Sequence, residues 1–189
     1  MEAAEAAGAN PRFVAAVRLL ALTGCRKDEV CRLRWSEVDL GAGLLRLADS
    51  KTGAKVVPLA PEAVALLARQ AREEGSPWVF PAARGPGPIR GLPKFFTRLC
   101  RSAGLAEVTL HTLRHSLAST AAASGASLFL VGKALGHANS ATTARYAHVQ
   151  VDPVAQVVAN AASWIDQAMR PQAVATLPNA RSQAEAKRR

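Results

Sequence analysis

Glycine and proline divide this chain into short segments, and the spacing of apolar residues within each segment limits what it can fold into. Phe13, Val14, Val17 and Leu20 recur at helical spacing, and Gly24 follows the end of that segment. This pattern is typical of a helix closed by a glycine. The same criteria predict helices over residues 12–23, 28–35, 62–74, 92–103, 110–124, 128–135, 140 to about 148, and 152–169.

A different pattern, in which apolar and polar residues alternate or apolar residues follow one another, occupies residues 38–40, 44–47 and 55–59. Glycine-containing turns separate these segments at 41–43 and 50–53. Three short strands joined by turns predict a small antiparallel sheet. Residues 77–93 carry many prolines and glycines around Phe80, which indicates an ordered loop. The expected fold class is therefore mainly α with a small antiparallel β-sheet (α+β).

The chain has 189 residues with 24 basic and 14 acidic side chains, a net charge of +10. This length suits one sizeable domain, which we expect over residues 1–169, followed by a basic, disordered tail over 170–189. A basic excess points to a polyanionic partner such as nucleic acid. The alternative interpretation is a solvated basic surface that only reflects an Arg- and Ala-rich composition. Without a membrane-length apolar run or a secretory signal, we expect a cytoplasmic protein with its three cysteines (Cys25, Cys31, Cys100) reduced.

Four segments concentrate polar residues within otherwise apolar sequence: TGCRKDEVCRLRW (23–35), SKTGAKVVPL (50–59), HTLRHSLAS (111–119) and LGHANSATTARYAHV (135–149). In the first, Arg26 lies at the entry of a predicted helix, where free N–H groups favour an anion. A plain ion pair of Arg26 with Asp28 or Glu29 explains the same pattern equally well.

In the third segment, His111, Arg114 and His115 fall at i, i+3 and i+4 and so share a helical face. The two histidines have the spacing of a metal pair, but no carboxylate stands between them, and Arg114 would repel a cation. We therefore expect no metal. Arginine forks and a histidine donor suit a phosphate better.

The fourth segment holds Tyr146, the only tyrosine of the chain, close to Arg145 and His148 and a few residues after His137. A phenol with a pKa near ~10 is almost entirely protonated at neutral pH, so a nucleophilic tyrosine needs cations and donors around it. A lone tyrosine is otherwise usually a packing residue. In the second segment, Lys51 lies in a turn between strands, where it is either a solvated lysine or a mobile proton donor.

In this order the four segments resemble the boxes of the tyrosine recombinase (phage integrase) family, and the likeness covers roughly residues 10 to 168. The resemblance implies the catalytic-domain fold of that family. It assigns the catalytic positions to Arg26, Lys51, His111, Arg114, His137 and Tyr146, with Glu29 and His115 in support.

The resemblance also implies a mechanism. Tyr146 attacks a DNA phosphodiester and forms a 3′-phosphotyrosyl link with a free 5′-hydroxyl. Arg26, Arg114 and the histidines hold the transition state, and Lys51 protonates the leaving oxygen. Because the covalent bond stores the energy of the broken linkage, neither a metal nor another cofactor is needed. Reversal on another strand's 5′-hydroxyl completes recombination.

Double-stranded DNA is the expected partner, and the enzyme is expected near the nucleoid, as a monomer or weak oligomer when free and as a homotetramer in the synaptic complex. Family members commonly carry an N-terminal core-binding domain, which we expect to be absent here because the likeness begins within the first dozen residues. Backbone contacts are expected from five basic residues, of which the last three form a stripe at i, i+4 and i+7: Arg32, Arg34, Lys94, Arg98 and Arg101.

Two other functions stay open. A non-enzymatic DNA-binding protein on the same domain would not need to keep Tyr146 and both arginines. A DNA-relaxing enzyme of the type IB topoisomerase class shares the chemistry but needs no partner subunit or specific site.

Overall fold

The computed structural model describes residues 8–48 and 53–136, all within Met1–Val151, the first of two units into which the chain divides. The expected fold class, helices with a small antiparallel sheet, is confirmed. In chain order the elements are α2 (Pro11–Thr23), α3 (Lys27–Cys31), the 3₁₀ helix η1 (Trp35–Glu37), β1 (Val38–Asp39), β2 (Leu44–Leu47), β3 (Lys55–Pro58), α4 (Pro61–Ala68), α5 (Leu92–Ser102), α6 (Leu110–Ala123) and α7 (Leu128–Leu135).

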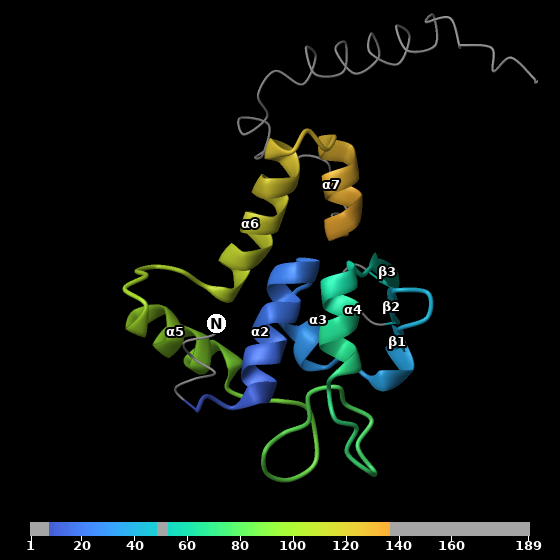
Figure 1. Ribbon diagram of the computed structural model, residues 1–189, viewed down its shortest axis with the longest axis vertical. Helices are drawn as coiled ribbons and strands as arrows, with labels where there is room; N and C mark the ends of the chain where they lie inside the picture. The colour runs from blue at the N-terminus through green and yellow to red at the C-terminus, as the bar shows by residue number, and fades with distance from the viewer. Residues whose placement is uncertain (1–7, 49–52, 137–189) are drawn as a thin grey trace, which may run out of the picture. The chain divides into compact units, whose positions relative to one another are not determined.

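Helix α2 is the element around which the others pack. The Asn10 side chain accepts a hydrogen bond from the Arg12 N–H, Pro11 occupies the first turn, and Gly24 ends the helix in the left-handed conformation with φ of 62°. Its buried face contacts α3, α4, α5 and α6 (Figure 1). The core consequently forms along α2, and the polar residues that follow Gly24 emerge from its end.

The three strands form an antiparallel sheet in the order β1-β2-β3. Leu45 pairs with Val57 and Leu47 pairs with Lys55 across β2 and β3. Because side chains alternate across a strand, the buried face carries Leu45, Leu47 and Val57, while Val56 is exposed. Lys55 therefore starts β3 on the same face as the buried Val57.

One expected helix, residues 28–35, is wrong in its second half. Helix α3 ends at Cys31, Arg34 is extended and pairs with Trp78 in the loop after α4, and Trp35 begins η1. The Val79 N–H donates to the Leu33 carbonyl at 2.9 Å, and the Trp35 N–H donates to the Pro77 carbonyl at 2.9 Å. Leu33 is buried, with 1% of its surface exposed. Its burial and these two hydrogen bonds to a segment distant in the sequence outweigh the local helical pattern.

The expected helix over 62–74 also ends early, at Ala68. The residues beyond it turn toward other elements: the Arg72 guanidinium lies 4.4 Å from the centre of the Trp35 ring, and Glu73 forms an ion pair with Arg12. The remaining elements among the described residues match their expected bounds to within two residues. The helices expected at 140–148 and 152–169, and the tail, lie outside the described residues.

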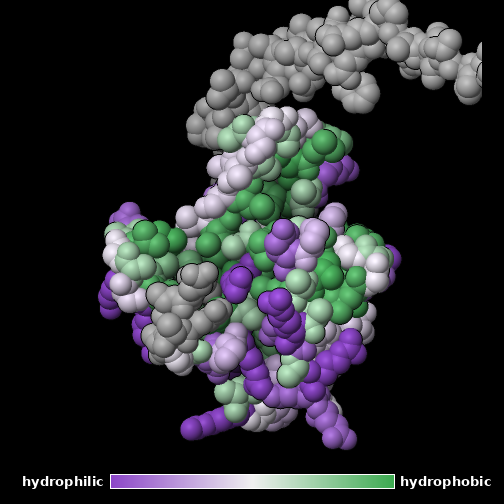
Figure 2. Space-filling view, in the orientation of Figure 1, coloured by the Kyte–Doolittle hydropathy of each residue, from purple (hydrophilic) through white to green (hydrophobic). Residues whose placement is uncertain are grey.

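A large core cluster surrounds α2, and a smaller one joins α6 to α7 through Ala118, Ala122, Val131 and Leu135. Figure 2 shows hydrophobic residues gathered over α6 and α7 on one face, while hydrophilic residues predominate over the loop after α4. Among the described helices, none combines the length and the apolar character that a membrane crossing requires.

Candidate active site

Arg26 is the residue at which the chain turns from α2 into α3. It caps α3 with extended backbone, and its N–H donates to Glu29 Oε2 at 2.7 Å, while its Nη1 donates to Glu29 Oε1 at 3.0 Å. The ion-pair interpretation thus holds for Glu29, whereas Asp28 pairs with Lys27. The Arg26 side chain is still 26% exposed. A guanidinium that is oriented by a carboxylate and open to solvent retains donors for a second anion.

Arg114 is buried, with 4% of its surface exposed. From α6 its Nη1 donates to the Gly24 carbonyl at 2.5 Å, and its Nη2 donates to the Leu135 carbonyl at 2.8 Å. Gly24 ends α2 just before Arg26, and Leu135 ends α7 just before His137. The Arg114 side chain therefore joins three of the polar segments that the sequence singled out.

Lys55 is a residue of this site that sequence reasoning missed. Its Nζ donates to Glu29 Oε2 at 2.7 Å, and its side chain is only 11% exposed. The signal was present in the strand pattern, because Lys55 has the same parity as the buried Val57. We call Arg26, Glu29 and Lys55 the charged cluster.

Glu29 stays ionised at the centre of the charged cluster. Burial favours the neutral acid, but hydrogen bonds from Lys55, from the Arg26 N–H and from the Arg26 guanidinium outweigh it, so the pKa of Glu29 lies below its ordinary value of 4.5. Both carboxylate oxygens accept hydrogen bonds, and the Glu29 side chain is 5% exposed. The cluster is therefore a buried anion held between two cations, one of which faces solvent.

The neighbouring Cys25 is a packing residue. Burial raises the pKa of its thiol, and the hydrogen bond with Thr23 and the positive charges of Lys55 and Arg114 offset that effect only in part. A protonated, buried thiol is a poor nucleophile. All three cysteines are free and buried, as expected of core residues.

His111 and His115 lie one turn apart on α6, as predicted. Their rings stand 4.5 Å apart and almost perpendicular, at 87°, with His111 exposed and His115 half-buried. Within residues 8–48 and 53–136, no three His, Cys, Asp or Glu side chains are grouped to hold a metal ion.

Three predicted catalytic positions, Lys51, His137 and Tyr146, lie outside the described residues. Gly136, which directly precedes His137, is described and adopts a φ of 67°. A Cβ at Gly136 would lie 3.2 Å from Lys55 Cδ, so the stem of Lys55 packs against this glycine.

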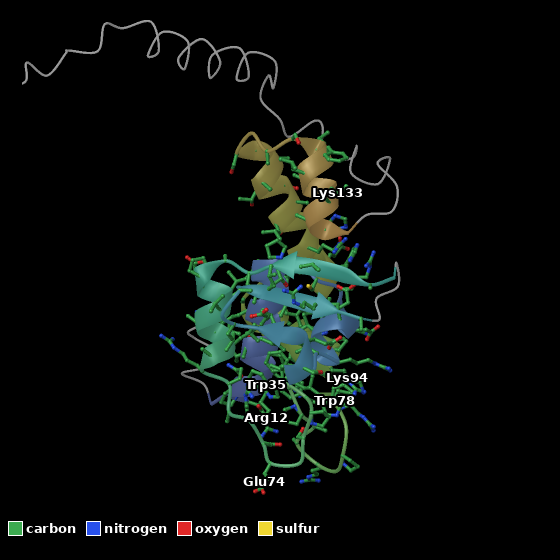
Figure 3. The ribbon with its side chains drawn as sticks, turned by 90° about the vertical axis from the view of Figure 1, so that its right-hand side faces the viewer. Arg12, Trp35, Glu74, Trp78, Lys94 and Lys133 are labelled. Carbon is green, nitrogen blue, oxygen red and sulfur yellow. The ribbon has the colours of Figure 1, made fainter. Side chains whose placement is uncertain are left out.

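The five residues expected to contact DNA backbone are all exposed: Arg32, Arg34, Lys94, Arg98 and Arg101. Arg32 lines a groove of about 350 Å³ between α3 and the start of α5, together with Lys27 and Arg90. The Arg34 guanidinium lies over Trp78, 4.7 Å from the ring centre. Figure 3 shows Lys94 projecting outward on the side of the molecule where Trp78 is labelled. Lys27 and Arg90 had no sequence signal beyond their charge.

The chain belongs to the phage integrase family, whose model matches residues 1–152. It is 35% identical over 149 residues to a tyrosine recombinase XerC of Xylella fastidiosa strain 9a5c, covering 76% of this chain and 50% of that protein. It is also 31% identical over 142 residues to the prophage integrase IntF of Escherichia coli K12, covering 72% of this chain and 30% of that protein. The chain thus spans half or less of the length of these curated relatives.

Solved structures give the same fold. The crystal structure of a XerA recombinase has a TM-score of 0.65 at 28% identity, and the match covers 84% of this chain and 58% of that one. An integrase of the Tn1549 transposon, in complex with transposon right end DNA, has a TM-score of 0.68 at 20% identity over 80% of this chain and 59% of that one. The tyrosine recombinase catalytic-domain fold expected from the sequence is therefore confirmed.

Proposed function

We propose that this chain is the catalytic part of a site-specific DNA recombinase that cleaves and rejoins strands through a 3′-phosphotyrosyl intermediate on Tyr146. The observation that carries the proposal is that two arginines meet at one backbone segment. Arg114 donates a hydrogen bond to the Gly24 carbonyl, and Arg26, two residues further along the chain, is oriented by the Glu29 carboxylate. Residues 1–169 make up the catalytic domain in this proposal, and 170–189 form a basic tail.

The chemistry follows from the charges. In-line attack by the Tyr146 oxygen on a phosphodiester places extra negative charge on the non-bridging oxygens. A positive charge ~4 Å from a negative one is worth about 4 kcal/mol at an effective dielectric near 20. Arg26 and Arg114, fixed before substrate arrives, stabilise that charge with little reorganisation. His111 and His137 add donors, His115 supports His111, and Lys51 gives its proton to the leaving 5′-oxygen.

Double-stranded DNA is the proposed substrate. A net charge of +10 and the exposed basic residues on α3 and α5 support this choice. Two of the similar solved structures, a XerH recombinase and the Tn1549 integrase, were determined with DNA bound. Strand exchange requires two duplexes, so we also propose a homotetramer in the synaptic complex, and we expect the protein to act near the nucleoid.

Covalent trapping tests the proposal. The chain is mixed, without metal, with nicked duplexes that carry inverted repeats from the DNA flanking its gene. Cleavage next to the nick releases a short strand and prevents rejoining. We expect an SDS-resistant adduct whose peptide map identifies Tyr146. Tyr146→Phe abolishes the adduct and keeps DNA affinity, because only the nucleophilic oxygen is removed.

The controls separate enzyme from DNA-binding protein. Arg69→Ala, at an exposed arginine that caps the end of α4, keeps full adduct formation. A wild-type chain that binds these duplexes and forms no adduct would replace the proposal with a DNA-binding regulator. Relaxation of an arbitrary plasmid by the monomer would instead favour a topoisomerase.

A further inference from the structure

Lys55 is a half-buried lysine of the charged cluster whose contacts the proposed mechanism does not use. Its ammonium lies 2.7 Å from Glu29 Oε2, the same oxygen that accepts the Arg26 N–H. The other carboxylate oxygen accepts from the Arg26 guanidinium at 3.0 Å. Lys55 and Arg26 are therefore linked through one carboxylate.

Placing an ammonium in a site that is 11% exposed is unfavourable unless a partner compensates for the lost hydration. Glu29 provides that compensation here. In turn, the two cations keep the carboxylate ionised, with its pKa below the ordinary value. Without Lys55, Arg26 alone would hold the Glu29 carboxylate, through its N–H on Oε2 and its guanidinium on Oε1, and nothing outside α3 and its cap would fix the orientation of this pair.

The stem of Lys55 ties a second segment to the cluster. It packs against Gly136, where even a methyl group would come within 3.2 Å of Lys55 Cδ. Helix α7, which Gly136 ends, also contacts β3, which Lys55 begins. One side chain at the start of β3 thus contacts α3 and the end of α7, and it lies close in the chain to Lys51.

We propose that Lys55 is a positioning residue, which holds the Glu29 carboxylate so that the Arg26 guanidinium points at the scissile phosphate. This inference rests on the proposed function, because it deepens the role of the same site. Lys55 transfers no proton in it; the proton of the leaving oxygen comes from Lys51.

The test measures the rate constant of adduct formation on the nicked duplex at saturating protein. Lys55→Met keeps the stem and removes the charge. We expect it to slow adduct formation about 10- to 100-fold, the cost of a small misplacement of a catalytic group. The DNA dissociation constant and the final adduct yield stay within about two-fold of wild type. Lys55→Arg, which keeps a donor for Glu29 Oε2, recovers most of the rate. Lys133→Met, at an exposed lysine of α7, is the matched control and reacts normally.

A double-mutant cycle identifies the route of the effect. If Lys55 acts through Glu29, Lys55→Met slows a Glu29→Gln variant much less than it slows the wild type. Equal slowing in both backgrounds contradicts the proposal. A variant that is merely misfolded lowers the adduct yield and the melting temperature rather than the rate constant.

A substrate with sulfur in place of the bridging 5′-oxygen separates positioning from proton donation, because a thiolate leaves without a proton. Sulfur is expected to restore Lys51→Met and not Lys55→Met. Restoration of Lys55→Met would make Lys55 the proton donor and overturn the inference, as would a wild-type rate in Lys55→Met. If the wild-type chain forms no adduct, the proposed function fails first.

Discussion

At the scale of single residues, Arg114 combines a structural role with its proposed chemical one. Two of its N–H groups are used by the carbonyls of Gly24 and Leu135 inside the protein. A guanidinium has five donors in a planar fork, and these two bonds fix the plane of the Arg114 guanidinium between the ends of α2 and α7. Substitution of this residue is therefore expected to affect folding as well as catalysis.

We predict that Arg114→Ala lowers the free energy of unfolding by roughly 2–4 kcal/mol, because it leaves buried carbonyls without donors. Urea denaturation followed by circular dichroism measures this. Arg98→Ala, at an exposed arginine of α5, serves as the control and changes stability by less than ~0.5 kcal/mol. A stability of Arg114→Ala equal to that of the control would show that the two backbone bonds carry no weight.

Glu29 predicts a pH dependence of stability. Its pKa is lower in the folded protein than the ordinary 4.5, so the ionised carboxylate stabilises the fold above that value. This contribution is lost as the pH falls below about 4.5 toward the folded-state pKa. Glu29→Gln cannot titrate, so its unfolding free energy should fall less steeply than that of the wild type between about pH 5 and pH 3.

Urea melts across that pH range provide the measurement, and Glu74→Gln, at an exposed glutamate after α4, is the control. Parallel curves for wild type and Glu29→Gln would mean that the charged cluster does not depend on the Glu29 charge.

At the scale of elements, the site depends on how tightly α6 and α7 approach the end of α2. A Cβ at Gly24 would lie 2.7 Å from Leu135 Cδ2 and 2.8 Å from Leu117 Cδ2. Gly24 also has a φ of 62°, which L-residues with a Cβ adopt at a cost. The glycine is thus required both by its conformation and by the close packing that lets Arg114 reach its carbonyl.

Gly24→Ala should be more destabilising than Gly125→Ala, and the comparison separates the two causes. Gly125 has a φ of 85°, and apart from Gly125 and its two chain neighbours no atom of the described residues lies within 4 Å of the place that an alanine methyl group would take there. Its substitution therefore costs only backbone strain, about 1–2 kcal/mol. Gly24→Ala adds overpacking of about 1–3 kcal/mol. Equal melting temperatures for the two variants would show that α6 and α7 move aside freely.

At the scale of the whole molecule, the net charge of +10 and the exposed arginines and lysines favour a polyanion. Lys94, Arg98 and Arg101 are exposed along α5 at helical spacing, and Arg32 lines the groove beside the start of that helix. These residues are proposed to position DNA without reading its sequence.

Replacing Lys94, Arg98 and Arg101 together by alanine should weaken DNA binding and flatten its salt dependence. If each contacts one phosphate, the slope of log K against log salt concentration becomes less negative by roughly 0.9 per contact, up to about 2.7. Fluorescence anisotropy at several salt concentrations measures the slope. Arg46, Arg69 and Arg84, which are exposed elsewhere, form the control triple. An equal loss of DNA affinity in both triple variants would mean that the effect comes from net charge alone and not from contacts along α5.

The spacing of apolar residues and the positions of glycine and proline were sufficient to predict most elements, because helices such as α6 and α7 have local caps and their own apolar faces. They failed for residues 33–35, where pairing with the loop at 77–79 is a long-range interaction without a local signal. The sequence also identified Arg26 and Arg114 by motif. It did not indicate that Arg114 would be buried.

By itself, the sequence determined the fold class, the membership in the phage integrase family and the order of the polar segments, since all of these follow from the spacing of residues and from short motifs. Only the tertiary structure decided that Lys55 meets Glu29 and that Arg114 spans the ends of α2 and α7. The physical reason is that ion pairs and hydrogen bonds between distant segments depend on burial and distance, which packing sets.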